Sequence, residues 1–368
     1  MQQHRFEPPV QFDMTPRVPG QNSMQTALDC MDLFCLCPYL NCVDFFICKH
    51  VLQGRIGNNV CILPNGAILQ KSVRKEYRML TNAERNRFHD AVRRLKRSGN
   101  YDVLSRIHQQ MASSSGAHSG PAFLPWHREY VKRVEIALRL IDPSLAIPYW
   151  DSVMDSYLPN PRDSIIWSTL FAGETDNSGN VINGPYIGFR TLEGRPNIRR
   201  SLGSEGRLFA ENDIWNVVNH RSISNVLAFT APEAGCPFSP NFEALEYKHG
   251  SVHLWVGGDM KPAYPPELPQ CANALHLKHS PMLPFNKQNA DGLSNDYTNN
   301  LYEYAPRPSC SWQVRSCGSP YLFCDVNHGQ PHCVSKIKVN GLCRGFEGED
   351  ACFRSICLNS VCRPYKRK

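Results

Sequence analysis

Five histidines stand in two groups, within segments whose apolar residues recur at helical spacing. The first group is His108, His118 and His127, and the second is His249 and His253. A single histidine on an apolar helix face is more often a hydrogen-bonded core residue than a metal ligand. Several buried imidazoles are costly to desolvate unless they share a partner. We therefore interpret the five histidines as metal ligands.

The residues around the histidines narrow the choice of metal, since neutral imidazole binds copper, zinc, iron or nickel. A di-iron bundle needs paired Glu-x-x-His motifs with further glutamates, and Glu246-x-x-His249 is the only one. A zinc peptidase of the His-Glu-x-x-His type needs a glutamate directly after its first histidine, but Gly250 follows His249. Ligation by imidazoles alone favours a pair of coppers that bind oxygen between them and oxidise a phenol or a catechol.

Two predicted helices lead up to His108. The first begins at a capping box, in which Thr81 and Glu84 satisfy each other's free backbone amides, and it ends before Gly99. Between them, Phe88, Ala91, Val92 and Leu95 have helical spacing. The second helix, over about 101–111, puts His108 on the same side as Leu104, Ile107 and Met111.

His118 is predicted to lie on a loop, because the segment 118–125 contains Gly120, Pro121 and Pro125. A third helix should run from about Trp126 to Ile141. Its predicted buried stripe contains His127 together with Val131, Val134, Leu138 and Ile141. Its predicted solvent-exposed stripe consists of Arg128, Lys132, Glu135 and Arg139.

The second histidine pair belongs to a later predicted helix. Residues 144–240 are rich in turn formers and should form long loops with short helices, such as one near 213–219. The helix that follows, over about 241–255, places His249 and His253 on one face, since positions four apart differ by about 40° around the axis. Leu245, Val252 and Val256 share that face.

The composition is that of a globular protein with one large domain and a small one: 368 residues, 42% hydrophobic and 20% charged. The net charge of +7 is spread over helices that also carry acids. We find no basic stripe with stacking aromatics, which argues against a nucleic-acid partner. The apolar segment 31–52 is interrupted by charged residues and by Pro38, which argues against a membrane span.

Sixteen cysteines cluster mainly at the two ends of the chain. Their even number favours disulfides and a secreted protein, although residues 1–5 show no apolar core of a signal peptide. Zinc knuckles are the alternative, but only Cys35-x-Cys37 is closely spaced. The pairing of the cysteines does not follow from the sequence.

The segment His118 to Arg128, followed by Pro148-Tyr149-Trp150-Asp151, resembles the first copper signature of the tyrosinase, catechol oxidase and haemocyanin family. The resemblance covers roughly residues 75–260. It implies a mainly α fold, with a helical bundle around two coppers and long loops. It also implies that His108, His118 and His127 bind the first copper, and that His249 and His253 are two ligands of the second.

The end of the chain resembles the cysteine-rich tail of tyrosinase-like proteins from molluscs and other invertebrates, in its cysteines and in the segments Met282 to Asn286 and Asp291 to Ser294. We therefore expect four parts. They are a polar arm (1–28), a cysteine-rich lead-in (29–74), a tyrosinase-like copper domain (75–265) and a small disulfide-rich C-terminal region (266–368).

The chain departs from the family where the third ligand of the second copper is expected. In the family this ligand lies in a segment resembling Asp-Pro-x-Phe-x-x-His-His, followed by an Asp-Arg pair. This chain passes from Met260 to Cys271 without such a segment, so we infer that the fourth bundle helix is deleted. A splice variant, a wrong gene model and real loss of function each explain this. His276 and His279 could replace the ligand, but we favour surface histidines in a loop.

Two smaller departures concern the substrate. Gly116 stands where some relatives have a cysteine linked to the second histidine, so no such thioether can form. Gly250 stands where several monophenol-oxidising members carry an asparagine that orients a water, which favours a catechol substrate. Glu246 could hold that water, or serve as an outer-shell or surface carboxylate. Phe123 and Trp126 are interpreted as packing residues.

The resemblance implies a secreted copper oxidase that converts o-diphenols, and in some members monophenols, to o-quinones for pigment or for cross-linking cuticle or shell matrix. Its partners would be molecular oxygen and a phenolic small molecule or a tyrosine- or catechol-bearing matrix protein, with no nucleic acid and no membrane. With the deletion, the first copper site survives while the second is empty or weak. The alternative is a non-catalytic matrix or copper-holding protein. Oxygen transport is disfavoured, because the cysteine-rich tail is not the partner domain that this role needs.

Overall fold

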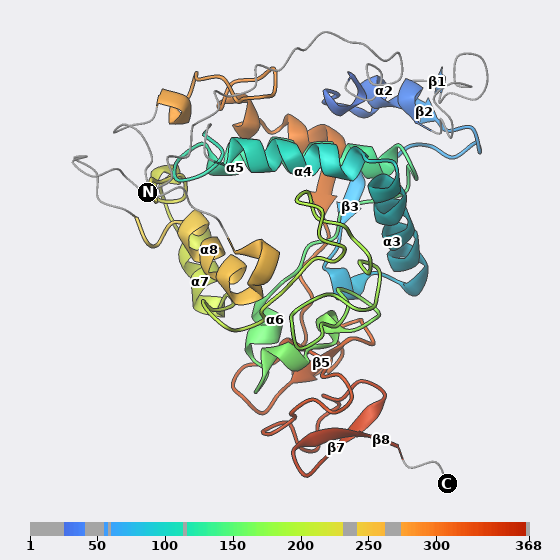
Figure 1. Cartoon of the computed structure of the whole chain (residues 1–368), viewed down its shortest axis with the longest axis vertical. Helices are drawn as coiled ribbons and strands as arrows, with labels where there is room; N and C mark the ends of the chain where they lie inside the picture. Colours follow the sequence, from blue (N-terminus) through green and yellow to red (C-terminus); the bar gives the residue numbers. More distant parts are fainter. Residues whose placement is uncertain are drawn as a thin grey trace.

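The computed structural model describes residues 26–40, 55–57, 60–112, 116–230, 241–261 and 274–365. Three helices frame its centre: α3 (Asn82–Arg97), α4 (Asn100–Met111) and α5 (Phe123–Arg139). Helix α3 packs against both α4 and α5, and stands across their right-hand ends in Figure 1. The predicted mainly α character is confirmed in this part of the chain.

The predicted capping box is present at the start of α3. Thr81 Oγ1 accepts from the Glu84 amide at 3.2 Å, and the Glu84 carboxylate accepts from the Thr81 amide at 2.8 Å. Gly99 has φ +79° and separates α3 from α4. Because only glycine adopts this left-handed conformation at little cost, it ends one helix and allows the next to start at once.

Helix α5 begins at Phe123, three residues before its predicted start, and ends at Arg139 rather than Ile141. Pro125 is the third residue of the helix. Backbone amides in the first turn have no partner within the helix, so a proline is tolerated there. The proline was therefore part of the helix and not of the loop before it.

The prediction of a solvent-exposed charged stripe on α5 was wrong. Lys132, Glu135 and Arg139 are 1–3% exposed. Glu135 forms two hydrogen bonds with Arg74, at 2.9 and 3.1 Å, and Arg139 donates to the Gln70 carbonyl at 2.6 Å. Strand β3 (Ser72–Arg74) and the N-terminal segment cover this side of the helix and supply the opposite charges and acceptors.

Two further helices carry the second half of the site. Helix α8 (Leu245–Val256) starts four residues later than predicted, and α7 (Glu211–Val218) matches the short helix expected near 213–219. Lys248 of α8 joins them through an ion pair with Asp213 at 3.4 Å. Lys248, Trp255 and Val256 of α8 are buried, Tyr247 is exposed, and the other residues of the helix are half-buried.

The rest of the described chain consists of short elements. Before the histidines lie α2 (Leu33–Leu36), η1 (Cys37–Tyr39) and η2 (Tyr77–Met79). The turn-rich middle contains α6 (Val153–Ser156), η3 (Pro161–Asp163), η4 (Ile165–Trp167) and η5 (Ile223–Asn225), as expected for long loops. After α8 come η6 (Gly258–Met260), η7 (Ala274–His276), η8 (Asp291–Leu293) and η9 (Tyr297–Leu301).

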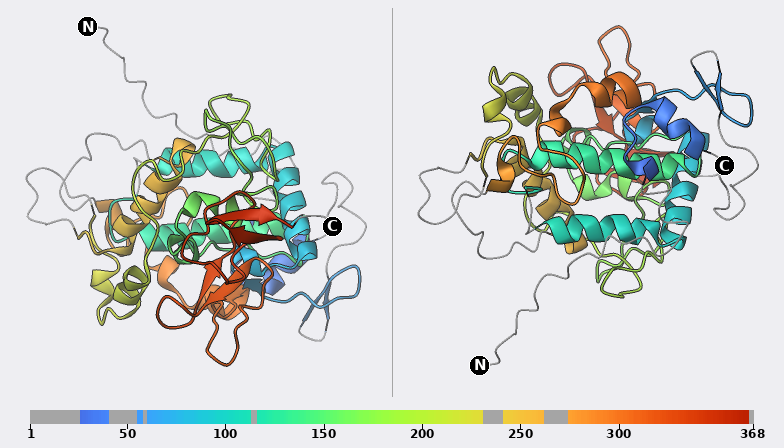
Figure 2. Two further views of the ribbon diagram at one scale, coloured as in Figure 1. Left: turned by 90° about the horizontal axis from the view of Figure 1, so that it is seen from below. Right: turned by 90° about the horizontal axis from the view of Figure 1, so that it is seen from above.

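The strands form four separate two-stranded sheets. Three are antiparallel: β1 (Arg55–Gly57) with β2 (Val60–Ile62), β5 (Leu322–Asp325) with β6 (His332–Ser335), and β7 (Ser355–Leu358) with β8 (Val361–Pro364). Strand β3 pairs in parallel with β4 (Tyr302–Tyr304). This pairing joins the segment before α3 to the segment that follows η9. The last two hairpins lie away from α4 and α5 in Figure 1, and they lie in front of the helices in the view from below (Figure 2).

The main hydrophobic core lies between α3, α5, the loops after α5 and α8, with Leu95, Ile136, Trp167 and Trp255 among its residues. A second core in the C-terminal region packs Phe323, Val334 and Ile337 around disulfides. The clusters cross between the helical and the disulfide-rich parts, since Tyr321 belongs to the main core and Leu158 to the second.

The described cysteines are all joined in disulfides, as the sequence favoured. The pairs are Cys30–Cys35, Cys37–Cys61, Cys310–Cys324, Cys317–Cys333, Cys343–Cys357 and Cys352–Cys362. Zinc knuckles built from these thiols are therefore ruled out. Cys42, Cys48, Cys236 and Cys271, and nearly all of the polar arm, lie outside the described residues. Within the described part, no helix has the length and apolar character needed to cross a membrane.

Candidate metal centre

His108, His118 and His127 come together at one end of α4 and α5. His108 lies in the last turn of α4, His127 near the start of α5, and His118 on the intervening loop, as predicted. One ring nitrogen from each lies within 4.8 Å of the others, and the ring centroids are 5.0–5.3 Å apart. Three imidazoles from two helices and a loop thus face a common point.

The hydrogen bonds around these rings leave lone pairs aimed at that point. His127 Nδ1 donates to the Phe123 carbonyl at 2.9 Å, so the lone pair of the neutral ring is on Nε2, which is 3.2 Å from His108 Nε2. Among the described residues, His118 Nδ1 is buried without a hydrogen-bond partner. In imidazoles that bind a metal, the ring nitrogen that does not face the metal typically donates a hydrogen bond to a group such as a backbone carbonyl.

His249 and His253 form the second cluster, on α8. Their Nε2 atoms are 3.0 Å apart, and His253 Nδ1 donates to the Met260 carbonyl at 2.9 Å. The lone pair of neutral His253 is therefore on Nε2 and points at His249. The four-residue spacing predicted this shared helix face.

Phe123 lies between the two clusters. Its ring centroid is 4.4 Å from that of His127 and 5.4 Å from that of His249. Phe123 is 6% exposed and Trp126, which stacks on Tyr130, is 1% exposed. The start of α5 and helix α8 lie near one another in Figure 1. The packing role expected for both aromatic residues agrees with these contacts.

Burial favours the neutral forms of His108, His118, His127 and His249. Burial lowers the pKa of His118 to about 4 and that of His249 to about 3, and neighbouring imidazoles add to the effect. Burial also lowers the pKa values of His108 and His127. Metal ligation requires the neutral imidazole, so these rings need not lose a proton at neutral pH to bind a metal ion.

His276 is not the surface histidine that we favoured, since only 7% of it is exposed. Its Nδ1 accepts from the Ala122 amide at 3.2 Å, and the backbone of His118 bonds to the same ring. His276 therefore supports the His118 loop instead of pointing a free lone pair at a metal. His279 is exposed, as expected, with Nδ1 3.2 Å from the Gln288 side chain.

Glu246 connects the two clusters, a role that its sequence position alone could not establish. Its carboxylate accepts hydrogen bonds from the Ser119 and Gly120 amides and from Thr230 Oγ1, the last at 3.0 Å. Ser119 has φ +76°, so the loop next to His118 adopts an unfavourable conformation that needs support. Burial raises the pKa of Glu246 to about 7, although these hydrogen bonds lower it.

Replacing Glu246 by glutamine should weaken copper binding at the His118 cluster by about tenfold, because the amide has one acceptor oxygen where the carboxylate has two. A copper titration of the purified chain measures the change. Glu243→Gln is a matched control, since Glu243 lies just before α8 and its carboxylate pairs with Lys248 at 2.6 Å. Equal copper affinity in both variants would show that Glu246 does not support the site.

Gly116 also shapes this loop. A Cβ at this position would lie 2.5 Å from the Leu275 carbonyl oxygen and 2.9 Å from Ala122 Cβ. The close packing therefore leaves no room for a side chain at this position. Because the residue is glycine, no thioether to His118 can form from it.

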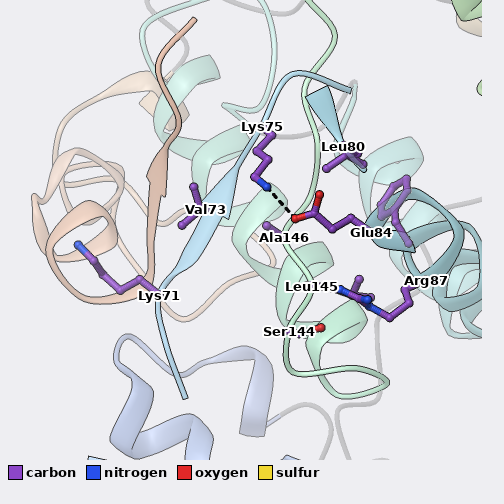
Figure 3. Close-up of a pocket in the computed structure, with 10 residues that line it drawn as sticks. Lys71, Val73, Lys75, Leu80, Glu84, Arg87, Ser144, Leu145 and Ala146 are labelled. Carbon is purple, nitrogen blue, oxygen red and sulfur yellow. Dashed lines mark hydrogen bonds and ion pairs between the residues drawn. The ribbon is translucent and has the colours of Figure 1, made fainter. Parts of the chain in front are cut away.

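A shallow pocket elsewhere on the molecule contains none of these histidines. Lys71, Lys75, Glu84, Arg87 and Leu145 are among its lining residues, and a 2.7 Å ion pair joins Lys75 to Glu84 across it (Figure 3). The other two cations pair with acids outside the lining, Lys71 with Glu303 and Arg87 with Asp142. We assign no function to it.

The donor set fits copper. All five candidate ligands are imidazoles, two of them have Nδ1 fixed by backbone carbonyls, and the described residues place no carboxylate among the three grouped nitrogens. Neutral imidazole suits copper, and carboxylates would be expected at a di-iron site.

Comparisons with known proteins agree with this chemistry. A family model for the common central domain of tyrosinase matches residues 98–269. The tyrosinase-like protein tyr-3 of Caenorhabditis elegans is 44% identical over 371 residues, which cover 90% of this chain and 51% of the nematode protein. A tyrosinase of Streptomyces glaucescens is 35% identical over 219 residues, which cover 54% of this chain and 76% of that protein. Tyrosinase-like protein 1 of Margaritifera margaritifera is 27% identical over 300 residues, covering 69% and 58%.

The histidine clusters and these similarities define a type 3 copper protein. Within that class, the chain belongs to the tyrosinase family, whose members are copper oxidoreductases that bind two copper ions. The chain spans about half the length of the nematode relative.

Proposed function

We propose that this protein oxidises o-diphenols to o-quinones with molecular oxygen. The first copper would be held by His108, His118 and His127, and the second by His249 and His253. The observation that carries this proposal is the approach of the two imidazole clusters to one another across Phe123. Family membership supports the reaction class.

The chain's own residues prepare the site for this chemistry. Copper, when bound, supplies electron transfer between the phenol and oxygen. The neutral imidazoles supply the lone pairs, and Phe123 and Trp126 exclude water on the side of α5. A dry, apolar surrounding strengthens every electrostatic interaction at the metal.

We further propose that the second copper has only two imidazole ligands. In the described residues, His276 is bonded to backbone and His279 is exposed, so neither supplies a third. The alignment with the nematode relative runs over 371 residues although it takes in only 90% of this chain's 368, so it sets residues of the relative against gaps here. The first observation supports the loss of the helix that carries the third ligand in the family, and the second shows only that this chain lacks residues that the relative has.

Catechols are the substrates that this site supports better than monophenols. Gly250 offers no side chain to orient a water beside His249. Glu246, the other candidate for that task, already bonds to the Ser119 amide and to Thr230. Among the described residues, neither Gly250 nor Glu246 therefore positions a water to accept the proton of a monophenol.

The second candidate function is copper holding without turnover. It is favoured by large apolar residues that are 49–70% exposed near α7 and α8. These residues are Trp215, Val218, Ile223, Phe242 and Tyr247. Such exposure is expected where a covering helix has been lost.

Copper content and catechol oxidation, measured on the same purified chain, test both proposals. We expect one tightly bound copper, a second that binds only at high free copper, and catechol oxidation that rises with the second. Absence of catechol oxidation with both coppers bound would favour the copper-holding function. Two equally tight coppers would show that another group completes the second site.

We also propose that the protein acts outside the cell, where its quinones would form pigment or cross-link cuticle or shell matrix through phenolic side chains. The six described disulfides support an oxidising compartment. Detection of the native protein in a secreted fraction, with its cysteines oxidised, would test this location.

A further inference from the structure

The tip of the β5–β6 hairpin carries another group of possible metal ligands, outside the copper cluster. Asp325 ends β5, His332 begins β6, and the two residues are cross-strand partners. His328 lies in the connecting turn, and Glu349 approaches from the loop between Cys343 and Cys352. One ligand atom from each of Asp325, His328 and Glu349 lies within 4.8 Å of the others.

The hydrogen bonds around this cluster leave a ring nitrogen with a lone pair that accepts no hydrogen bond from the described residues. His332 Nδ1 lies 2.8 Å from the Gln330 carbonyl, which can only accept, so the lone pair of the neutral ring is on Nε2. That Nε2 is buried, has no hydrogen-bond partner among the described residues, and lies 3.6 Å from Asp325 Oδ2. Glu349 Oε2 is also buried, and burial together with the adjacent Asp325 carboxylate raises the pKa of Glu349. Unpaired buried acceptors that face a carboxylate are costly unless a cation lies among them.

The simpler interpretation is a hydrogen-bonded turn. Asp325 Oδ1 accepts from the Asn327 amide at 2.8 Å and from the His328 amide at 3.2 Å, and its Oδ2 accepts from His328 Nδ1 at 2.8 Å. These bonds account for the burial of Asp325. They leave His332 Nε2 without a hydrogen-bond partner in the described part of the chain, and they do not explain why the Glu349 carboxyl lies against that of Asp325.

Disulfides hold the backbone near Asp325, His332 and Glu349. Cys324 precedes Asp325 and is joined to Cys310, and Cys333 follows His332 and is joined to Cys317. Cys324 and Cys333 are themselves cross-strand partners. Cys352, three residues after Glu349, is joined to Cys362. Ligands on a rigid frame need little ordering when a metal binds.

We propose that Asp325, His328 and Glu349 bind a divalent metal ion, with His332 placed beside Asp325 to supply a fourth ligand, and that the ion is Zn²⁺. Two imidazoles and two carboxylates match the nitrogen and oxygen donors of four-coordinate zinc. The metal would join the hairpin tip to the loop that carries Glu349. Its charge would neutralise the carboxylates of Asp325 and Glu349. This site is independent of the proposed oxidase activity.

The test is the zinc content of the full-length chain after dialysis against micromolar free zinc. Glu349→Gln and His328→Ala should each lower bound zinc by one equivalent. Asp350→Asn is the matched control, because Asp350 is the next residue, is 81% exposed and pairs with Lys336 at 2.6 Å. Its zinc content should equal that of the wild type. The copper-site imidazoles also bind zinc, so His127→Ala should remove a separate equivalent that adds to the loss in Glu349→Gln.

Thermal unfolding provides the second measurement. In the His127→Ala background, added zinc should raise the unfolding midpoint, and the rise should disappear when Glu349→Gln is also present. Far-ultraviolet circular dichroism establishes that each variant folds, and His328→Ala serves if Glu349→Gln does not, since the His328 side chain is 49% exposed. The proposal is overturned if these variants keep the zinc content of the wild type, or if His127→Ala alone removes all bound zinc.

Discussion

His127→Ala should abolish tight copper binding, whereas His253→Ala should leave the tightly bound copper in place. His127 is one of three imidazoles that converge on one point, with its Nδ1 fixed by the Phe123 carbonyl. Loss of such a ligand should weaken binding by more than the roughly 10–100-fold that loss of an outer-shell partner costs. His253 belongs to a cluster of two, so its removal should affect only the weakly held copper.

Elemental analysis and a copper titration measure this asymmetry, and catechol oxidation should be lost in both variants because the reaction needs both ions. His279→Ala is the matched control, since it removes an exposed imidazole that contacts only Gln288 among the contacts described for it. If His253→Ala lost as much tight copper as His127→Ala, the second cluster would be as complete as the first, and our proposal of a missing ligand would fail.

The sequence was sufficient to locate the helices and the histidines where local signals are strong. The Thr81–Glu84 capping box, the φ-permissive Gly99 and the four-residue spacing of His249 and His253 are local features, and each predicted its element. The start of α5 was misplaced because Pro125 looks like a helix breaker, while the first turn of a helix tolerates it.

Features that depend on distant partners could not be predicted in the same way. Lys132, Glu135 and Arg139 were predicted to form a solvent-exposed stripe. The partners of Glu135 and Arg139, which are Arg74 and Gln70, lie far away in the sequence, and so does Asp29, the partner of a residue next to Lys132. His276 read as a surface residue for the same reason, since its partners are the backbone amide of Ala122 and the backbone of His118. Burial of a polar group is decided by its partner, and the partner is identified only in the folded chain.

The Glu246 contact shows how this limit bears on function. The sequence allowed a water-holding, outer-shell or surface role, and its contacts with Ser119 and Thr230 favour support of the His118 loop. The same α8 residue thus bonds to the segment that carries a ligand of the first copper. Changes that displace α8, such as loss of a covering helix, are therefore expected to reach the first copper site through this contact.

Glu129→Gln should destabilise the protein by about 3–5 kcal/mol, the cost typical of breaking a buried ion pair. Glu129 is 0% exposed and its carboxylate bonds to Lys132 at 3.0 Å, Arg133 at 2.7 Å and Tyr297 Oη at 2.6 Å. Glutamine keeps the shape but removes the counter-charge of the buried Lys132, and among the described residues it leaves Arg133 with only its ion pair to the half-exposed Asp29. Urea unfolding measures the difference in the free energy of unfolding.

Glu205→Gln is the control for Glu129→Gln, because it breaks a 2.6 Å ion pair with Lys261 in which both side chains are about half exposed. Its cost should stay below about 1 kcal/mol. Burial raises the pKa of Glu129, but the charges of Lys132 and Arg133 outweigh it, and the folded pKa lies below the usual value. The stabilisation is therefore complete above the unfolded pKa of about 4.3 and is lost as pH falls through the folded pKa. The gap between wild type and Glu129→Gln should accordingly narrow in acid, and a gap that stays constant with pH would show that packing, and not the ion pair, sets the cost.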